Sequence, residues 1–202
     1  MRFLIESDRR SDYLAETEEI DYSERSIHRL ADELRAGASD DTGFVKAAYE
    51  YVRDRISHSW DIQDARVTCA ASEVLRHGHG ICYAKSNLLC AILRSEGIPT
   101  GFCYQRLTLG DTPDTGHCLH ALNAVYLDTP GRWVRLDARG NKPGIDARFS
   151  LGEERLAFPI RGHYDEIDYP TIHAGPNPKT IAVLKQSSDV LAMYRNRLPD
   201  RI

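Results

Sequence analysis

Apolar positions recur at helical spacing over much of the first half of the chain. In residues 26–34 and again in residues 44–56, apolar side chains return every three or four positions, which predicts two amphipathic helices. The segment between them, residues 37–41, reads Gly-Ala-Ser-Asp-Asp, a sequence that ends one helix and caps the next. Residues 71–75 predict a shorter helix, which the glycines of the following stretch terminate.

A glycine-punctuated turn precedes Cys82. Residues 77–81 read His-Gly-His-Gly-Ile, and the apolar positions that follow, at residues 88–93, are spaced as in a helix. Gly97 ends this helix and Pro99 lies just beyond it. The pattern therefore places Cys82 at the start of a helix, where unpaired N–H groups and the helix dipole favour a thiolate over a thiol. The same N–H groups can stabilise a developing oxyanion.

Beyond the fourth predicted helix the period of the pattern becomes strand-like. Residues 100–109, 118–127 and 133–138 predict three strands, with a turn at residues 129–131 between the second and the third. A last helix is predicted over residues 180–194. Helices that come first and an antiparallel meander that follows predict an α+β fold.

Length and composition bound the organisation of the chain. The 202 residues suffice for one hydrophobic core, and we expect a single domain over residues 1–202, with a core at about 40–140 and a C-terminal extension at 141–202. A formal net charge of −4 argues against a nucleic-acid partner. No apolar run reaches the length of a membrane span, and the first residues turn charged before a signal-peptide core can form, so we expect no membrane partner. The five cysteines are an odd number without a Cys-x-x-Cys pair, which favours free thiols in a cytoplasmic protein.

The predicted strands supply the partners that a thiol nucleophile needs, a base within reach and an acceptor that orients it. His117 and His120 lie near the start of the second strand, and Asp137 lies near the end of the third. Antiparallel neighbours bring the start of one strand beside the end of the next, so these residues are expected at one edge of the sheet. A tight four-residue turn would place Asp137 opposite Ala124 rather than His120, so a stagger, a bulge or a longer loop is required.

Three sequence blocks resemble bacterial members of the transglutaminase-like superfamily, in the branch described as cysteine proteases. The first is Gly-Ile-Cys at residues 80–82, opening a helix that ends in Arg-x-x-Gly-Ile-Pro at residues 94–99. The second is a His-Ala strand that ends in Val-Tyr, at residues 120–126. The third is a strand with an early aromatic residue and a terminal Asp, at residues 133–137. Upstream, residues 60–63 also resemble that branch.

The resemblance implies a papain-like transglutaminase core, with N-terminal helices packed on an antiparallel β-meander. It implies a triad in which Cys82 is the nucleophile, His120 the base and Asp137 the residue that orients the base. The implied activity is hydrolysis or acyl transfer at an amide or peptide bond through an acyl-enzyme, with a peptide or protein substrate and neither a cofactor nor a metal. Where the family has Trp and Glu after the histidine, this chain has Leu122 and Ala124, which predicts a reshaped cleft.

Other histidines offer rival chemistry. His117 lies three residues before His120, an odd offset that points the two side chains to opposite faces of an undistorted strand, so only one can face Cys82. The resemblance selects His120, and His117 is the second choice of base. With His77 and His79, these residues also include the ligand types of a zinc site, but no compact pair has the spacing of a zinc finger, so a metal is the weaker interpretation.

Several further residues receive supporting roles. Trp60, Gln63 or Tyr83 could supply the second donor of an oxyanion hole, beside the backbone N–H of the cysteine. Arg135 and Arg139 could bind a substrate carboxylate, but a solvated surface with one or two structural ion pairs is the favoured interpretation. The other four cysteines have no comparable context and are expected to pack in the core: Cys69, Cys90, Cys103 and Cys118.

Two other functions stay open from the sequence. One is a non-catalytic peptide-binding module that retains the fold, which the departures at Leu122 and Ala124 motivate. The other is an acyltransferase that uses a coenzyme A thioester, although no phosphate-binding loop is evident.

Overall fold

The structure is a computed structural model that describes residues 3–110 and 112–202. Four helices come first in the chain: α1 (Arg25–Ala36), α2 (Asp41–Arg55), α3 (Ala71–His77) and α4 (Cys82–Ser95). All four match helices that the apolar spacing predicts. The predicted cap is also confirmed, because the Asp40 side chain accepts a hydrogen bond from the Gly43 amide at 2.7 Å.

The central sheet is antiparallel and has the strand order β6-β5-β4-β7. Three strands follow one another as the predicted meander: β4 (Thr100–Thr108), β5 (His117–Leu127) and β6 (Arg132–Leu136). The fourth, β7 (Ile167–Asp168), comes from the C-terminal extension and pairs with β4. Two residues are too few to show a strand period, so the sequence does not predict β7.

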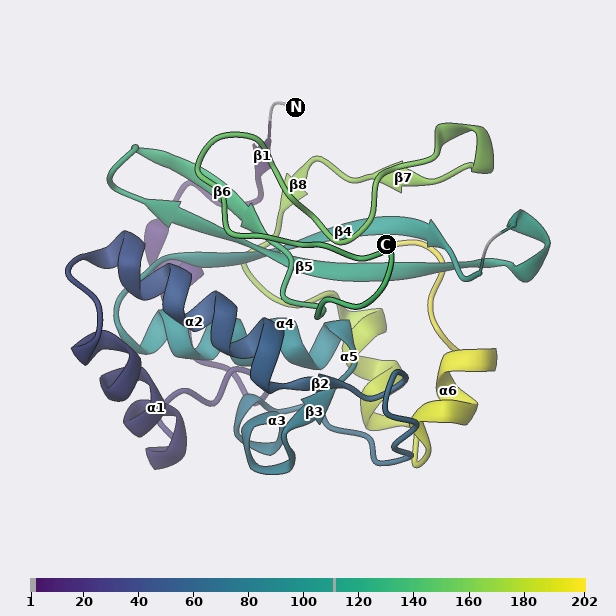
Figure 1. Cartoon of the computed structure of the whole chain (residues 1–202), viewed down its shortest axis with the longest axis horizontal. Helices are drawn as coiled ribbons and strands as arrows, with labels where there is room; N and C mark the ends of the chain where they lie inside the picture. The colour runs from purple at the N-terminus through teal and green to yellow at the C-terminus, as the bar shows by residue number, and fades with distance from the viewer. Residues whose placement is uncertain (1–2, 111) are drawn as a thin grey trace.

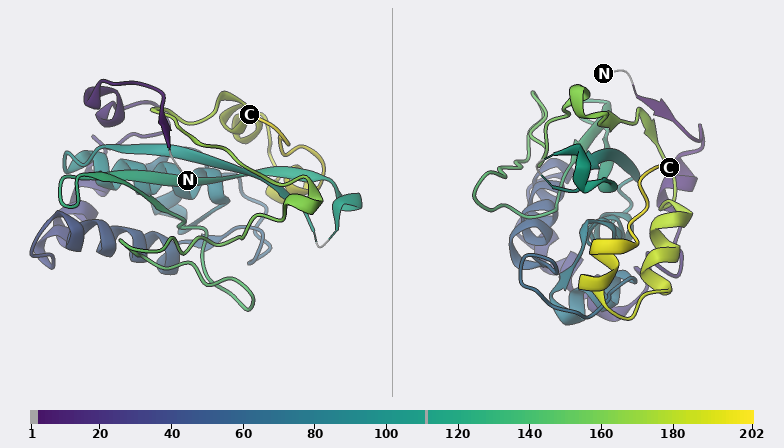
Figure 2. Two further views of the ribbon diagram at one scale, coloured as in Figure 1. Left: turned by 90° about the horizontal axis from the view of Figure 1, so that it is seen from above. Right: turned by 90° about the vertical axis from the view of Figure 1, so that its right-hand side faces the viewer.

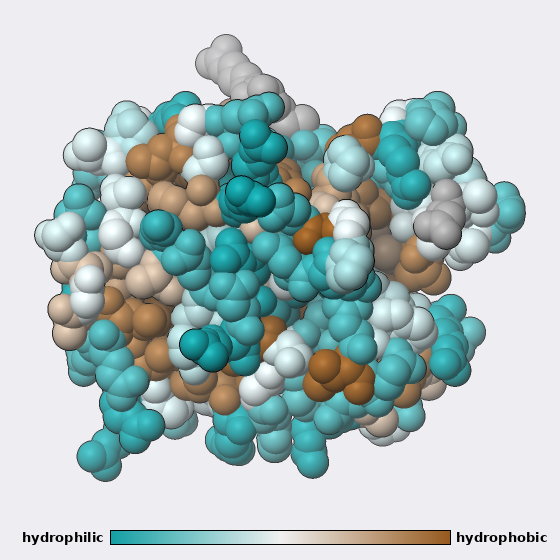
Figure 3. All heavy atoms as spheres, in the orientation of Figure 1, coloured by the Kyte–Doolittle hydropathy of each residue, from teal (hydrophilic) through white to brown (hydrophobic). Residues whose placement is uncertain are grey.

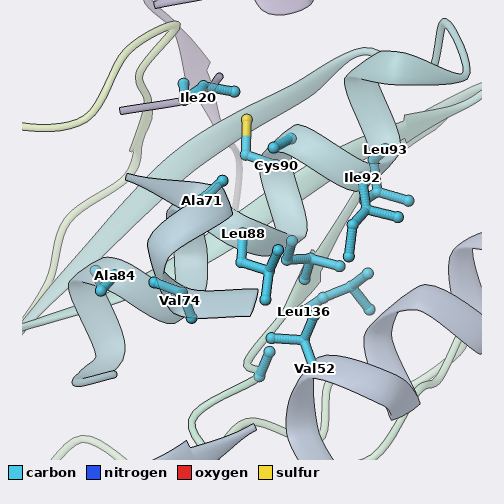
Figure 4. Packing of buried hydrophobic residues seen from close by; sticks show 14 of the residues in the cluster. Ile20, Val52, Ala71, Val74, Ala84, Leu88, Cys90, Ile92, Leu93 and Leu136 are labelled. Carbon is cyan, nitrogen blue, oxygen red and sulfur yellow. The ribbon is translucent and has the colours of Figure 1, made fainter. Parts of the chain in front are cut away.

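The four helices cover one face of the sheet (Figure 1). The helix α4 is buried on all sides from Cys82 to Arg94, which makes it the centre of the hydrophobic core. Figure 4 shows Leu88 of this helix in one cluster with Val52 of α2 and Leu136 of β6. The predicted α+β fold, with helices packed on an antiparallel meander, is therefore confirmed.

Two short parallel pairs tie distant segments together. The strand β2 (Ser57–His58) pairs with β3 (His79–Gly80), which fixes the end of α2 beside the turn that leads into α4. The strand β1 (Leu4–Ile5) pairs with β8 (Thr171–Ile172) on the side of the sheet away from the four helices (Figures 1 and 2). Three short 3-10 helices also occur in the described residues: η1 (Arg10–Leu14), η2 (Pro113–Thr115) and η3 (Gly162–Tyr164).

The prediction of one last helix over residues 180–194 is wrong. The chain forms two helices there, α5 (Pro178–Lys185) and α6 (Val190–Asn196). Asp189 caps α6, because its side chain accepts a hydrogen bond from the Ala192 amide at 2.8 Å. Ser and Asp side chains compete for backbone groups outside helices, and at residues 187–189 this local preference outweighs the helical spacing of the apolar positions.

The surface shows no large apolar area on the face drawn in Figure 3, where hydrophobic residues form small groups among hydrophilic ones. Scattered apolar residues of this kind are normal and carry no functional meaning. Within residues 3–110 and 112–202, no helix is both long enough and apolar enough to cross a membrane.

Candidate active site

Cys82 is the first residue of α4, as predicted, and it is 8% exposed. The preceding residue, Ile81, takes the N-cap position in an extended conformation. Because the first N–H groups of a helix have no acceptor within the helix, the Cys82 amide is available to an oxyanion. A Cβ atom on Gly80 would lie 3.0 Å from the Cβ of Ala84 and 3.1 Å from the Thr68 hydroxyl, which explains the glycine two residues before the cysteine.

His120 and Asp137 form a buried, hydrogen-bonded pair. The Nε2 atom of His120 lies 2.8 Å from Oδ2 of Asp137, and the two residues are 4% and 1% exposed. The carboxylate also accepts hydrogen bonds from two backbone amides, that of Arg139 at 3.2 Å and that of Ala157 at 3.0 Å. These donors hold Asp137 as an anion, and the anion fixes the orientation of the imidazole.

Opposing effects set the charges of this pair. Burial would lower the pKa of His120, but the charges of Asp137 and Cys82 and hydrogen bonds to both side chains raise it to about 10. Burial would raise the pKa of Asp137, but the imidazolium and the backbone amides hold it below its ordinary value. At neutral pH the pair is therefore an imidazolium and a carboxylate. Cys82 is among the groups that raise the pKa of His120, as expected of a thiol close to the ring.

Cys82 and His120 line one cleft of about 700 Å³. A cleft of this size admits a small molecule or several residues of a peptide. Its wall is mixed in character, because it combines aliphatic and aromatic side chains with four cationic ones. The cationic residues are Arg139, Lys142, Arg161 and Arg195.

Residues 28–138, more than half of the chain, match the family profile of the transglutaminase-like superfamily. The chain belongs to the transglutaminase-like superfamily. The matched segment contains the whole of α2, α3, α4 and the meander, and it ends one residue after Asp137. Comparison with curated proteins finds no match.

Solved structures are similar to this chain at low sequence identity. A proposed cysteine protease from Cytophaga hutchinsonii is 16% identical, with a TM-score of 0.53 over 66% of this chain and 43% of that one. The periplasmic domain of TgpA from Pseudomonas aeruginosa is 19% identical, with a TM-score of 0.48 over 64% of this chain and 46% of that one. This chain therefore spans less than half the length of either protein.

The transglutaminase-like site also uses residues beyond the matched segment. The backbone amide of Ala157 binds Asp137, and the Phe158 ring stands edge-on to the His120 ring, with centroids 5.2 Å apart and an interplanar angle of 87°. Sequence reasoning missed both residues. A backbone amide has no side-chain signature, and Phe158 lies in a stretch without helical or strand-like periodicity, so no sequence signal marks either one.

Two of the three candidate donors for the oxyanion hole are engaged elsewhere. The Tyr83 hydroxyl donates to the Leu119 carbonyl at 2.8 Å, and the Gln63 amide donates to the Trp60 carbonyl at 2.5 Å. Trp60 lines the cleft and stacks on Tyr194 of α6, with ring centroids 4.6 Å apart. The Trp60 indole is therefore the member of the predicted set that the geometry favours.

The rival histidines His117 and His79 have partners outside the transglutaminase-like cleft. The Nε2 atom of His117 lies 2.7 Å from the Tyr164 carbonyl, and the Nδ1 atom of His79 lies 2.9 Å from the Ser59 hydroxyl. His77 and His79 do not line the cleft. Among the described residues, no group of three or more His, Cys, Asp or Glu side chains could hold a metal ion.

The prediction that Leu122 and Ala124 reshape the cleft is wrong. Both are fully buried in a second apolar cluster, with Tyr13 and Ile172, and neither lines the cleft. Successive side chains of a strand point to opposite faces of the sheet, and these two lie on the face that β8 covers. Apolar residues are therefore required there to fill the core.

The arginines beside Asp137 form ion pairs, as expected. Arg135 is 2.6 Å from Glu154 and 2.7 Å from Asp168, and Arg139 is 2.5 Å from Asp61. All five cysteines are free. Of the four cysteines expected to pack in the core, Cys90, Cys103 and Cys118 are buried and Cys69 is half-buried. Cys118 differs from the other three because it also lines the cleft.

Lys85 is a buried cation that sequence reasoning missed. It lies one turn after Cys82 in α4, is 1% exposed, and donates a hydrogen bond to the Ile56 carbonyl. Burial and the positive charge of Arg139 lower the pKa of Lys85 to about 7, against the opposing charge of Asp137. In a helix that is buried on all sides, no periodicity distinguishes a buried lysine from an exposed one.

Proposed function

We propose that this transglutaminase-like domain is a thiol-dependent enzyme that acts on amide or peptide bonds through an acyl-enzyme. One observation carries the proposal: a buried, hydrogen-bonded His120–Asp137 pair shares a cleft with Cys82. A thiol at a helix start beside an oriented imidazole is what nucleophilic acyl transfer requires. A purely structural cysteine needs neither an oriented base nor a cleft.

In the proposed mechanism, Asp137 holds Nε2 of His120, and Nδ1 of the imidazolium carries the proton that Cys82 gives up when its thiolate forms. The thiolate attacks the carbonyl carbon of the substrate, and the Cys82 amide and the Trp60 indole stabilise the oxyanion. The C–N bond then breaks as His120 returns its proton to the leaving nitrogen, and an acyl thioester remains on Cys82. His120 next takes a proton from water, which attacks the thioester and releases the acid and the thiol.

An amine can replace water in the second half of the reaction. The thioester then becomes a new amide, and the enzyme is a transglutaminase rather than a protease or amidase. We favour water as the acceptor, because it is always present and the sequence shows no separate site for an amine. Mass spectrometry of the products, with and without an added primary amine such as glycine methyl ester, distinguishes the two outcomes.

The proposal is tested by replacing the nucleophile. Cys82→Ala and Cys82→Ser are expected to abolish turnover of amide and peptide probes, and to abolish labelling of the reactive thiol by iodoacetamide. Cys69→Ala is the matched control, because Cys69 is half-buried and does not line the cleft. If the Cys82→Ala protein kept full activity, this mechanism would be wrong.

A non-catalytic peptide-binding module is the second candidate from the sequence, and the structure weakens the argument for it. The departures that suggested it, Leu122 and Ala124, lie in the core and not in the cleft. A module of this kind would bind peptide probes without turning them over. A thioester-using acyltransferase would instead transfer the acetyl group of acetyl-coenzyme A to an amine and leave simple amides intact.

The organisation and setting of the chain are part of the same proposal. We propose that residues 1–202 act as one domain, because the extension beyond residue 140 supplies β7 to the sheet and Ala157 and Phe158 to the site. The free thiols fit a cytoplasmic enzyme that acts on a peptide or protein. The acidic net charge argues against a nucleic-acid partner.

A further inference from the structure

The chain that follows α6 forms part of the wall of the cleft. Residues 198–201, here called the post-α6 segment, run from α6 up to the central sheet (Figure 1). Leu198 lines the cleft that holds Cys82, and the Pro199 carbonyl accepts a hydrogen bond from the Leu119 amide at 2.7 Å. Because Leu119 immediately precedes His120 in β5, the backbone of this segment lies beside the proposed base.

The Leu119 amide belongs to an open stretch of β5. The neighbouring strand β6 pairs with β5 only from Asn123 to Leu127, so among the described residues no strand continues the sheet on that side of Leu119. An open strand edge binds an extended peptide through main-chain hydrogen bonds. The post-α6 segment uses the edge in this way, through a carbonyl group of its own backbone.

A buried arginine lies across the sheet from Leu119, on the neighbouring strand. Arg106 of β4 pairs with Leu119 in the sheet and is 5% exposed. Its Nη1 donates to the Asp165 carboxylate at 2.8 Å, and its Nη2 lies 3.8 Å from the carboxylate of Asp200 in the post-α6 segment. Its Nε is buried and has no hydrogen-bond partner among the described residues. A buried guanidinium with an unused donor has capacity for a further carboxylate oxygen.

The charge of the cleft agrees with an anionic ligand. Among the described residues that line the cleft, four side chains are cationic and one, Glu166, is a carboxylate, although the chain as a whole carries a net charge of −4. Asp61, which does not line the cleft, pairs with two of the cations, Arg139 and Lys142. A concave surface of one sign raises the local concentration of ligands of the opposite sign. The cleft is therefore expected to attract acidic peptides, although the protein surface as a whole is acidic.

We propose that the Leu119 amide, the Arg106 guanidinium and the adjoining wall of the cleft form a subsite for an extended peptide with an apolar residue two positions before an acidic one. The post-α6 segment, which reads Leu198-Pro199-Asp200, occupies this subsite in cis. The inference rests on the proposed function for its meaning, because a peptide held beside His120 is then the substrate whose amide bond Cys82 attacks.

A substrate must displace the post-α6 segment, and the contacts to be broken are few. The Asp200 side chain is 59% exposed at its 3.8 Å ion pair, and exposed pairs of this kind contribute little. A tethered segment nevertheless competes at an effective concentration on the order of millimolar. The segment is therefore expected to weaken the apparent binding of a free peptide of the same sequence without preventing it.

The test measures peptide binding in Cys82→Ala protein, so that turnover does not enter. The probe is fluorescein-labelled Arg-Leu-Pro-Asp-Arg amide, the sequence of residues 197–201, and fluorescence anisotropy follows its binding. Adding Leu198→Gly and Asp200→Asn weakens the occupant, so this triple variant is expected to bind the probe about tenfold more tightly than the Cys82→Ala parent. A matched variant that adds Leu4→Gly and Asp32→Asn, at positions outside the cleft, is expected to bind as the parent does.

A second probe, with Asn in place of its Asp, tests the role of charge. It is expected to bind the triple variant about fivefold more weakly than the first probe, because it cannot form a charge-assisted bond to Arg106. Equal binding of the two probes overturns the proposal. Unchanged binding of the first probe also overturns it, provided that the circular dichroism spectrum of the triple variant matches that of the parent.

Two provisions keep the result interpretable. Should the triple variant fail to fold, Asp200→Lys in the Cys82→Ala protein places like charges side by side at Arg106, and it is expected to tighten binding of the first probe in the same way. Every readout is a binding measurement in a protein without the nucleophile. Failure of the proposed catalytic function would leave these results unchanged, so the two failures are distinguishable.

Discussion

The Nε2 atom of His120 lies 2.8 Å from Oδ2 of Asp137, although the two residues are not paired across the sheet. The register aligns Asn123 with Leu136, so Asp137 follows the end of β6 at the level of Leu122, two residues from His120. Diagonal neighbours on antiparallel strands are within reach of a long side chain such as histidine. A tight four-residue turn would have left Asp137 two residues farther away, and the observed stagger brings the carboxylate to the imidazole.

Asp137→Asn is expected to lower kcat/KM on amide probes by about 10³–10⁴-fold, because the amide neither stabilises the imidazolium nor enforces the orientation of the ring. The charge of Asp137 is a main cause of the raised pKa of His120, about 10 in the native protein. Its removal should therefore move the alkaline limb of the pH–rate profile to lower pH. Steady-state kinetics between pH 5 and pH 10.5 measure both effects.

The control for this prediction is Asp61→Asn, which removes a carboxylate that contacts Arg139 but not His120. It is expected to leave the alkaline limb in place. An Asp137→Asn enzyme whose profile kept the alkaline limb of the native protein would show that the carboxylate does not set the charge of the base.

The parts of the site that could be predicted from the sequence are those with a local signal. The glycine turn and the apolar face of the next helix are enough to place Cys82 at a helix start, and turns and strand periods bring His120 and Asp137 to one edge of a sheet. The role of Ala157 depends on the path of a loop, which no period records. Strand periodicity likewise puts Leu122 on one of two faces, but does not say which face meets α4 and which meets β8.

Phe158→Ala is expected to lower kcat/KM by between about tenfold and 100-fold, because the edge-on ring limits the orientations of the His120 imidazole and covers it from water. Alkylation of Cys82 by iodoacetamide should slow as well, because it depends on activation of the thiol by an oriented His120. This small reagent is insensitive to the shape of the cleft, so its rate does not report on substrate binding. Phe149→Ala is the matched control, because the Phe149 ring contacts Tyr49 instead. Unchanged alkylation in Phe158→Ala with a raised KM would assign Phe158 to substrate binding rather than to positioning of the base.

The stability contributed by His120 is expected to depend on pH with a definite sign. Its pKa in the folded protein, about 10, lies above its ordinary value of 6.5, so its contribution is complete below pH 6.5 and is lost as the pH rises toward 10. His120→Gln is therefore expected to lower the free energy of unfolding by about 3 kcal/mol at pH 5.5, since it leaves the Asp137 carboxylate buried without its cation. The difference from the native protein should shrink steadily up to pH 10.

Urea unfolding of both proteins at pH 5.5, 8 and 10 measures this difference, with His117→Gln as the control. His117 binds a backbone carbonyl and has no buried carboxylate partner in the described residues. A His120→Gln deficit that grew with pH would contradict the assignment of an imidazolium–carboxylate pair.

Lys85→Met is expected to stabilise the protein, and the gain in the free energy of unfolding should be largest at low pH. Burial lowers the pKa of Lys85 to about 7 from an ordinary 10.5, so folding disfavours the charged form. The cost is complete below pH 7 and vanishes as the pH rises to 10.5, because the unfolded chain then also releases the proton. Met has nearly the same length and no charge, and we expect a gain in the free energy of unfolding on the order of a few kcal/mol at pH 6.

Above pH 10 the order should reverse, because Lys85→Met then only loses the hydrogen bond to the Ile56 carbonyl and leaves that oxygen buried without its donor. Lys46→Met, at an exposed position of α2, is the control and should change stability little at any pH. Urea midpoints at pH 6, 8 and 10.5 give the comparison. The prediction would be wrong if Lys85→Met were less stable than the native protein at pH 6. The contacts of the ammonium group with the residues around Asp137 would then stabilise the fold by more than the burial of its charge destabilises it.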